Sequence, residues 1–305
     1  MLKVLRTKAL QFSGLRPIAK GDENLHGRSI VELEDVLEQA YLLPTIPAVV
    51  HELLGSFDRS DIDVDAISSR VALDQVIAAK VLRMANSAQF SRGRKIGSIH
   101  DAVMVLGFNR VRTLVIASGA STMRPDLPGF DHLAYWRHNL LTACFARTIG
   151  ALVKTRPEEC FVTGLMHRIG ELLLRSVEPE RYRQIDKAVA GGQPRLLAER
   201  TVIGLDHGVV GAALAREWSL PGPIGEAMQH YGNPLEHLAD DRLAVILSLA
   251  ESLATMLAGG ASTAEAVEAL PPELTAIIGL DVGELAEQAD SVLAEASDWL
   301  TLLGT

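Results

Sequence analysis

Aromatic residues are scarce in this sequence, and long hydrophobic runs are missing. Phe, Trp and Tyr make up 5% of the 305 residues. Apolar residues recur at spacings of three and four rather than two, which is typical of helices. No stretch of about 18 uninterrupted apolar residues predicts a membrane span. The basic start of the chain is not followed by an apolar core or a small-residue cleavage site, so we expect no secretory signal and a cytoplasmic protein.

Cysteine is nearly absent, as are the short motifs of several enzyme classes. Cys144 and Cys160 both lie among apolar residues. Two cysteines cannot form a disulfide framework, so we expect two buried thiols in a reducing compartment. The sequence has no P-loop, no GxGxxG, no CxxC pair and no nucleophile elbow. These absences argue against several nucleotide-binding, redox and serine-hydrolase classes.

Basic residues are missing from the last part of the chain. From Leu243 to Thr305 there are ten acidic residues and no Lys or Arg, while the whole chain carries a formal charge of −9. A negative chain repels phosphate backbones, so nucleic-acid binding is disfavoured. A local basic cluster nevertheless predicts a surface for an anion or a partner, although a solvated loop is the alternative. It consists of Arg83, Arg92, Arg94 and Lys95.

The pattern predicts an all-α fold of two helical lobes. Hydrophobic residues make up 48% of the chain, enough for a sizeable core. Two stretches, 135–154 and 158–177, are apolar almost all round and predict buried helices. Asp74, Asp101 and Asn109 are predicted helix caps, and Ser262 with Glu265 forms a capping box. We divide the chain into a basic arm (1–28), an amino-terminal lobe (29–124), a second lobe (125–258) and acidic helices (259–305).

Residues 98–115 have a helix–glycine–helix pattern that is also seen in DNA-binding proteins. Asn109, Arg110 and Arg112 lie on the second helix of this pattern. The apolar residues around them favour a helical hairpin packed into the lobe instead.

Four histidines lie on four different predicted helices or helix starts of the second lobe. Neutral imidazole is a common metal ligand, and helices that meet in one core can bring such groups together. Glu251, on a fifth helix, could add a carboxylate. The alternative is that each histidine is an ordinary core or surface residue, and spacing alone does not decide. The four are His138, His167, His207 and His230.

The stretch GLMHRIGE at 164–171 resembles the HD superfamily signature, in which a His-Asp pair binds metal for phosphohydrolysis. Further stretches resemble one branch of it, the HDOD domain, across residues 35 to 258. They are LPTIPAVVHELL, VLRMANSAQF, IGSIHDAVMVLGFNRVRTLV and GLDHGVVGAALAREWSLPGPIGEAMQHYG. The resemblance implies a non-catalytic relative of the HD and HD-GYP phosphodiesterases that acts in bacterial signal transduction through protein partners.

This chain departs from the HD signature at Arg168, which stands in the place of the aspartate. Arginine has no lone pair for a metal and carries a fixed positive charge. At the position of a later aspartate the chain has Glu251. We therefore predict a vestigial site with no metal, no cofactor and no catalysis, in which Arg168 and Glu251 form a buried ion pair. An arginine that reaches solvent and a residual site made of imidazoles alone are the alternatives.

The sequence thus predicts a non-catalytic HDOD protein that binds signalling proteins and does not bind a membrane. The acidic carboxy-terminal helices are a second candidate contact surface or a face for self-association. The competing hypothesis is a metal-dependent phosphodiesterase or phosphohydrolase that acts on a cyclic dinucleotide or another nucleotide.

Overall fold

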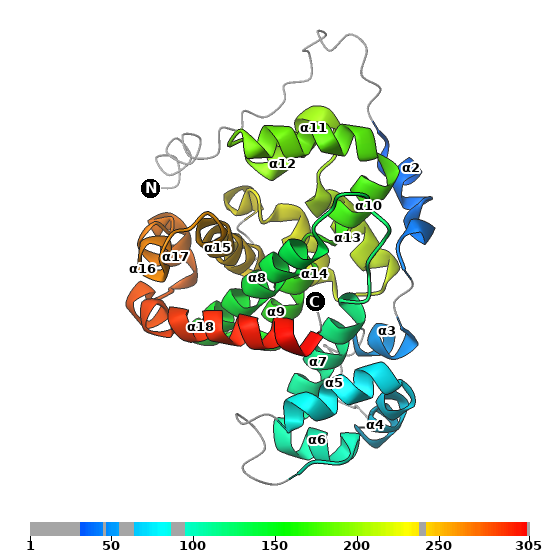
Figure 1. Cartoon of the computed structure of the whole chain (residues 1–305). Helices are drawn as coiled ribbons and strands as arrows, with labels where there is room; N and C mark the ends of the chain where they lie inside the picture. The colour runs from blue at the N-terminus through cyan, green and yellow to red at the C-terminus, as the bar shows by residue number, and fades with distance from the viewer. Residues whose placement is uncertain (1–30, 45–46, 55–63, 87–94, 238–241, 304–305) are drawn as a thin grey trace.

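The protein is built from helices throughout the part of the chain that the structure describes. The computed structural model describes residues 31–44, 47–54, 64–86, 95–237 and 242–303. Every regular element in these ranges is an α-helix or a short 3-10 helix, which confirms the all-α prediction (Figure 1). The predicted basic arm, residues 1–28, lies outside the described residues.

Helix α8 (His132–Leu152) is the centre of the fold. It packs against α9 (Pro157–Met166), α15 (Arg242–Ala258) and α18 (Val282–Leu303). Its buried side chains include Trp136, Leu140 and Phe145, which are inaccessible to solvent. A helix that is apolar almost all round must be covered on most sides, so the prediction of a buried helix here is confirmed.

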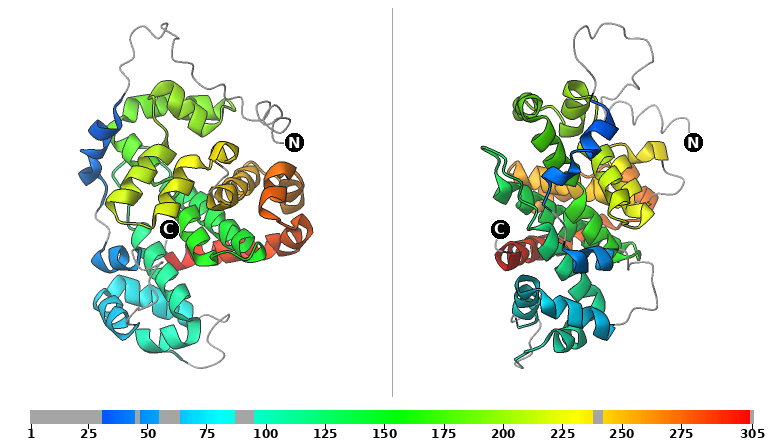
Figure 2. Two further views of the ribbon diagram at one scale, coloured as in Figure 1. Left: turned by 180° about the vertical axis from the view of Figure 1, so that it is seen from behind. Right: turned by 90° about the vertical axis from the view of Figure 1, so that its right-hand side faces the viewer.

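The amino-terminal helices join this centre through α7, which contacts α3, α5, α6 and α9. Figure 2 shows α4, α5 and α6 at one end of the molecule, away from α11 and α12. Asn86 closes the link between α5 and α6, because its side chain donates to Ile96 O at 2.7 Å and accepts from Ile96 N at 2.8 Å. The elements are α2 (Leu33–Leu37), η1 (Ala40–Leu42), α3 (Ala48–Leu54), α4 (Val64–Leu73), α5 (Gln75–Ala85), α6 (Ile99–Leu106) and α7 (Phe108–Ala120).

A second group of helices covers the other end of α8 and α9. Within it α10 packs on α13, α11 on α12, and α14 on both α13 and α15. The elements are α10 (Ile169–Val177), α11 (Pro179–Ala190), α12 (Arg195–Val202), α13 (His207–Glu217), α14 (Gly222–His230) and η2 (Pro234–His237).

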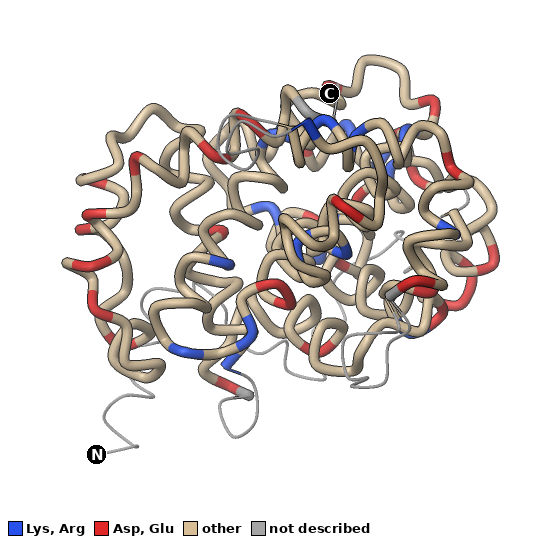
Figure 3. Tube along the Cα trace, turned by 90° about the horizontal axis from the view of Figure 1, so that it is seen from below, with Lys and Arg blue, Asp and Glu red and all other residues tan. Residues whose placement is uncertain are grey.

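The acidic carboxy-terminal helices pack on the body of the protein. They are α16 (Thr263–Glu268), α17 (Pro272–Ile278) and α18, and they carry Asp and Glu but no Lys or Arg (Figure 3). The predicted capping box of Ser262 and Glu265 is present at the start of α16. Helix α18 contacts α8 and reaches α5, where Arg83 donates to Thr301 O at 3.2 Å. One face of this acidic segment is therefore used inside the chain.

Several predicted helix limits are wrong. The stretch 158–177 forms two helices, α9 and α10, with a break at His167 and Arg168. Asp74 does cap α5, but Asp101 does not cap α6: the Ser98 side chain accepts from the Asp101 amide instead. Helix α7 begins at Phe108, directly after Gly107, whose φ of 82° lies in the region that favours glycine.

No single helix in the described ranges is long and apolar enough to cross a membrane. Helices α6 and α7 reach that length and composition only when they are joined, and they are bent by 119° at their junction.

Helix α10 approaches α13 closely just after the break that precedes it. A Cβ atom added to Gly170 would lie 2.3 Å from the His207 carbonyl oxygen and 2.6 Å from the Gly211 amide nitrogen. Both neighbours are backbone atoms, which cannot turn aside as a flexible side chain can. Glycine at this position allows the two helices to pack at their observed distance.

We expect Gly170→Ala to lower the free energy of unfolding by about 1–3 kcal/mol, because the added methyl group forces α10 and α13 apart. Urea unfolding followed by circular dichroism measures this change. Gly222→Ala is the matched control, since a Cβ at Gly222 meets no atom within 4 Å. Equal effects of the two substitutions would contradict the close approach.

Candidate functional site

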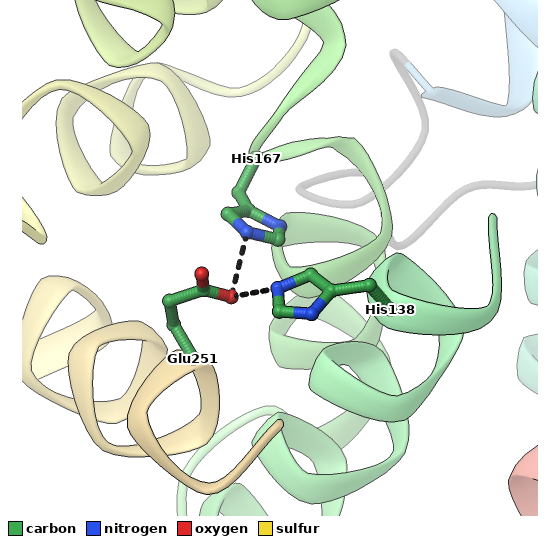
Figure 4. A group of neighbouring side chains, drawn as sticks. All are labelled: His138, His167 and Glu251. Carbon is green, nitrogen blue, oxygen red and sulfur yellow. Dashed lines mark hydrogen bonds and ion pairs between the residues drawn. The ribbon is translucent and has the colours of Figure 1, made fainter. Parts of the chain in front are cut away.

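Two histidines and one glutamate from separate elements point toward one another in the second lobe (Figure 4). His138 lies on α8, His167 at the break between α9 and α10, and Glu251 on α15. Glu251 Oε2 lies 2.6 Å from His138 Nε2 and 3.1 Å from His167 Nε2. One potential ligand atom from each residue lies within 4.8 Å of the others. We call these three residues the triad.

The hydrogen bonds of His167 determine which of its nitrogens faces the triad. Its Nδ1 lies 2.6 Å from the Gly164 carbonyl oxygen, which can only accept, so Nδ1 carries the proton. Burial lowers the pKa of His167 below its usual value, and Glu251 opposes this only in part. The other ring nitrogen, Nε2, faces Oε2 of Glu251.

The carboxylate of Glu251 remains ionised beside the two imidazoles. Burial would raise the pKa of Glu251, but His138 and His167 outweigh it and hold the pKa well below its usual range. Oxygen Oε2 also accepts from the Thr142 hydroxyl at 3.2 Å. Two ring nitrogens thus face one anionic oxygen, so the place favours a cation, either a proton on an imidazole or a metal ion that replaces it.

The triad fits one divalent ion. Two imidazole nitrogens and a carboxylate oxygen are ligands that transition-metal ions accept, and the bond from His167 to Gly164 is the kind of outer contact that orients a metal ligand. His138, His167 and Glu251 would hold the ion, and an ion held there would act as a Lewis acid on a bound water.

The predicted ion pair between Arg168 and Glu251 is wrong. Arg168 Nε donates to Glu171 Oε2 at 2.8 Å, and a second nitrogen of the same guanidinium also donates to this oxygen. The short turn at the break places residues 168 and 171 side by side, whereas Glu251 is occupied by the histidines. Only 12% of the Arg168 side chain is exposed, so the alternative of an arginine that reaches solvent is also wrong.

Glu171 is the buried centre of a cluster of charged side chains. Its side chain is 1% exposed and contacts three guanidinium groups. Burial alone would raise the pKa of Glu171, but Arg168, Arg195 and Arg175 hold it well below its usual range. Arg175 also forms two hydrogen bonds of 2.7 Å with Asp186 on α11. The cluster thus links α10, α11, α12 and the break beside the triad.

His207 lies near the triad but is held by other partners. Its Nδ1 lies 2.7 Å from Glu199 Oε2, and its Nε2 lies 2.6 Å from the Tyr231 hydroxyl. Tyr182 donates to the other oxygen of Glu199. The Tyr231 ring packs edge-on against the ring of His167, with centroids 5.6 Å apart. A buried polar chain therefore runs from Tyr182 to the wall of the triad.

The structure brings together three of the six residues predicted for the vestigial site. His207 and His230 lie outside the triad, and His230 is the last residue of α14. Arg168 adjoins the triad through its neighbour His167 but bonds elsewhere.

A family model described as the HDOD domain matches residues 43–234. The chain belongs to the HDOD family. This confirms the resemblance noted in the sequence.

Solved structures support the same fold. A candidate phosphohydrolase from Shewanella amazonensis SB2B is 31% identical with a TM-score of 0.75, and the match covers 88% of this chain and 97% of the other. An HDOD domain protein of unknown function from Geobacter sulfurreducens is 24% identical with a TM-score of 0.70. This match covers 87% of this chain and 99% of the other. An uncharacterised protein from Treponema pallidum (strain Nichols) is 23% identical over 68% of this chain, which spans only 41% of that relative.

The predicted basic surface is only partly placed by the structure of this HDOD protein. Arg92 and Arg94 lie outside the described residues, and Lys95 is exposed. Arg83 bonds to α18 of its own chain. The role of these residues in binding a partner therefore stays a prediction.

Sequence reasoning missed Glu171, Glu199 and Tyr231. A glutamate inside the run IGELLL, three residues after an arginine, is a readable signal, since residues three apart on a helix are neighbours. Glu199 and Tyr231 carry no such local signal, because their partner His207 lies eight residues after Glu199 and 24 residues before Tyr231.

Because the folded-state pKa of Glu171 is lowered, its contribution to stability is present above the unfolded pKa, near 4.5, and is lost as the pH falls toward the folded value. We expect Glu171→Gln to lower the free energy of unfolding by about 3–5 kcal/mol at pH 7 and by progressively less below pH 4.5. Urea unfolding of both proteins between pH 7 and pH 3 measures the difference.

Glu180→Gln is the control for this series. Glu180 forms an exposed pair with Arg183, with side chains 77% and 63% exposed. Exposed ion pairs contribute little to stability, so the free energy of unfolding of Glu180→Gln should stay close to that of the wild type at every pH. If the difference in free energy of unfolding between Glu171→Gln and the wild type does not shrink as the pH falls, the stabilising role of the arginines is contradicted.

Proposed function

We propose that this HDOD protein is a non-catalytic signalling protein that acts by binding partners. One observation carries the proposal: the residue after His167 is an arginine whose guanidinium is buried against Glu171. In the HD signature that place holds a metal-binding aspartate. The triad therefore offers a single carboxylate, and a second metal ion would lack an acidic ligand and lie close to a fixed positive charge.

Binding of a protein partner has support from the surface at the amino-terminal end. Several large apolar side chains on α4, α5 and α6 are exposed there, led by Leu73 at 84% and Met104 at 74%. Contiguous exposed apolar patches are typical of protein-binding surfaces, and these side chains are the candidates for such a patch. Partners would be signalling proteins, as the family resemblance implies.

We expect the purified full chain, supplied with Mn²⁺ or Fe²⁺, to release no product from bis-p-nitrophenyl phosphate or from a cyclic dinucleotide. Absorbance of nitrophenolate and chromatography of the dinucleotide measure turnover. Metal-dependent turnover that disappears in His167→Ala would contradict the proposal, because it would place the reaction at the triad.

A metal-dependent phosphohydrolase is the second candidate, and the triad itself favours it. The relative from Shewanella amazonensis SB2B is a candidate phosphohydrolase, and the two sequences are 31% identical. A single ion at the triad is compatible with either function, whereas turnover is compatible only with the second.

Metal stoichiometry tests the triad directly. We expect Mn²⁺ or Zn²⁺ to bind the metal-free protein with no more than one equivalent at the triad, measured by isothermal titration calorimetry. His138→Ala removes a ligand nitrogen and should weaken this binding at least tenfold, whereas His230→Ala should leave it unchanged. Two equivalents lost together in His138→Ala would contradict the one-ion site.

A further inference from the structure

A cavity of about 630 Å³ opens beside the triad. Its wall is formed by the segment before α8, by α8 itself, by the break before α10, by α10, α11 and the start of α12, and by the end of α15. His138 and Arg168 line it, so the cavity reaches the triad. None of this wall belongs to the amino-terminal helices.

The charged side chains that line the cavity have an excess of one positive charge. Four arginines face three carboxylates, which are Asp131, Glu171 and Asp186. Glu171 is buried among guanidinium groups, and Asp131 accepts from the Ala134 amide at the start of α8. These two carboxylates are therefore already satisfied by groups of the protein. The four arginines are Arg168, Arg175, Arg183 and Arg195.

Arg195 has more donors left for a ligand than Arg168 or Arg175, the other arginines of the buried cluster. Its side chain is 22% exposed, and one nitrogen, Nη1, makes both of its long contacts, each 3.3 Å, with Glu171 and Asp186. Arg175 is used far more fully, because it bonds both oxygens of Asp186 and one oxygen of Glu171. A guanidinium group carries five N–H donors, so Arg195 keeps most of its donors available.

Aromatic rings form another part of the wall. Phe130 is half-buried, and its ring centroid lies 5.5 Å from that of Tyr135. The Arg175 guanidinium lies 4.6 Å from the Phe130 ring and 4.2 Å from the Tyr182 ring. The wall thus combines flat apolar surface with donors for an anion, and the volume suits a small organic molecule.

We propose that this cavity binds a small organic anion made of a flat ring and a phosphate group, with the phosphate at Arg195 and the ring against Phe130. Arginine suits this role because its planar group can offer two parallel hydrogen bonds to phosphate oxygens. The inference deepens the proposed function and rests on it in one respect: the bound ligand is left uncleaved and acts as a signal.

Phenyl phosphate is the probe, used with the full-length protein in the presence of a chelator and followed by isothermal titration calorimetry. We expect binding that weakens at least tenfold in Arg195→Gln, because the main free donors are lost. Asp186→Asn removes a competing carboxylate and should strengthen binding severalfold. Opposite changes from two substitutions in one cluster are not expected from a general loss of structure.

Arg183→Gln is the matched control. It removes the same charge from the cavity wall, but Arg183 is 63% exposed and paired with Glu180. The affinity of the Arg183→Gln protein for phenyl phosphate should stay within about twofold of that of the wild type. Circular dichroism melting of each variant shows whether it is folded. A folded Arg195→Gln protein that binds like the wild type would overturn the proposal, as would a wild type that does not bind at millimolar concentration.

Two further ligands test the ring and the charge separately. Inorganic phosphate should bind at least tenfold more weakly than phenyl phosphate, and equal binding would overturn the role of Phe130. Benzoate should bind more weakly than phenyl phosphate, and its binding should be lost in Arg195→Gln if both ligands use the anion site. Tighter binding of benzoate than of phenyl phosphate would overturn the choice of phosphate. Release of phenol after Mn²⁺ is added would contradict the proposed function alone, since binding with chelator present is measured independently.

Discussion

The burial of one carboxylate, that of Glu171, is the constraint on which this part of the structure depends. An ionised group that is 1% exposed needs compensating charge, and three guanidinium groups supply it. They come from three places: the break before α10, α10 itself and the start of α12. Arg175 extends the cluster to Asp186 on α11. Four elements are therefore held in register by a single acid.

The same cluster decides what the triad can do. Arg168 is fixed by Glu171, so its charge stays next to His167. The nearby triad holds one carboxylate, Glu251, shared by two imidazoles. One divalent ion would find three ligands in this arrangement. A second would find a guanidinium group where an acidic ligand is needed, and charge repulsion would add to the missing bond.

The sequence predicted the all-helical architecture and the buried α8, because hydrophobic periodicity depends on local residue order. It placed His138, His167 and Glu251 in one vestigial site, but together with three further residues that the structure leaves outside the triad. The break at His167 was not predictable in this way. Residues 158–177 are mostly apolar and contain no proline, so local propensity favours one helix. The break coincides with a local bond from His167 to Gly164 and with one tertiary contact, the close packing of Gly170 against α13.

The partner of Arg168 was mistaken for a different reason. Glu171, three residues after Arg168, was overlooked as its partner, and the two imidazoles bind Glu251 instead. The cavity and the triad then share a wall, since Arg168 and His138 belong to it. A ligand that shifts Arg168 must change the field at Glu251, and an ion at Glu251 must change the affinity for the ligand by the same factor. Coupling of this kind would allow a site without turnover to report on two signals at once.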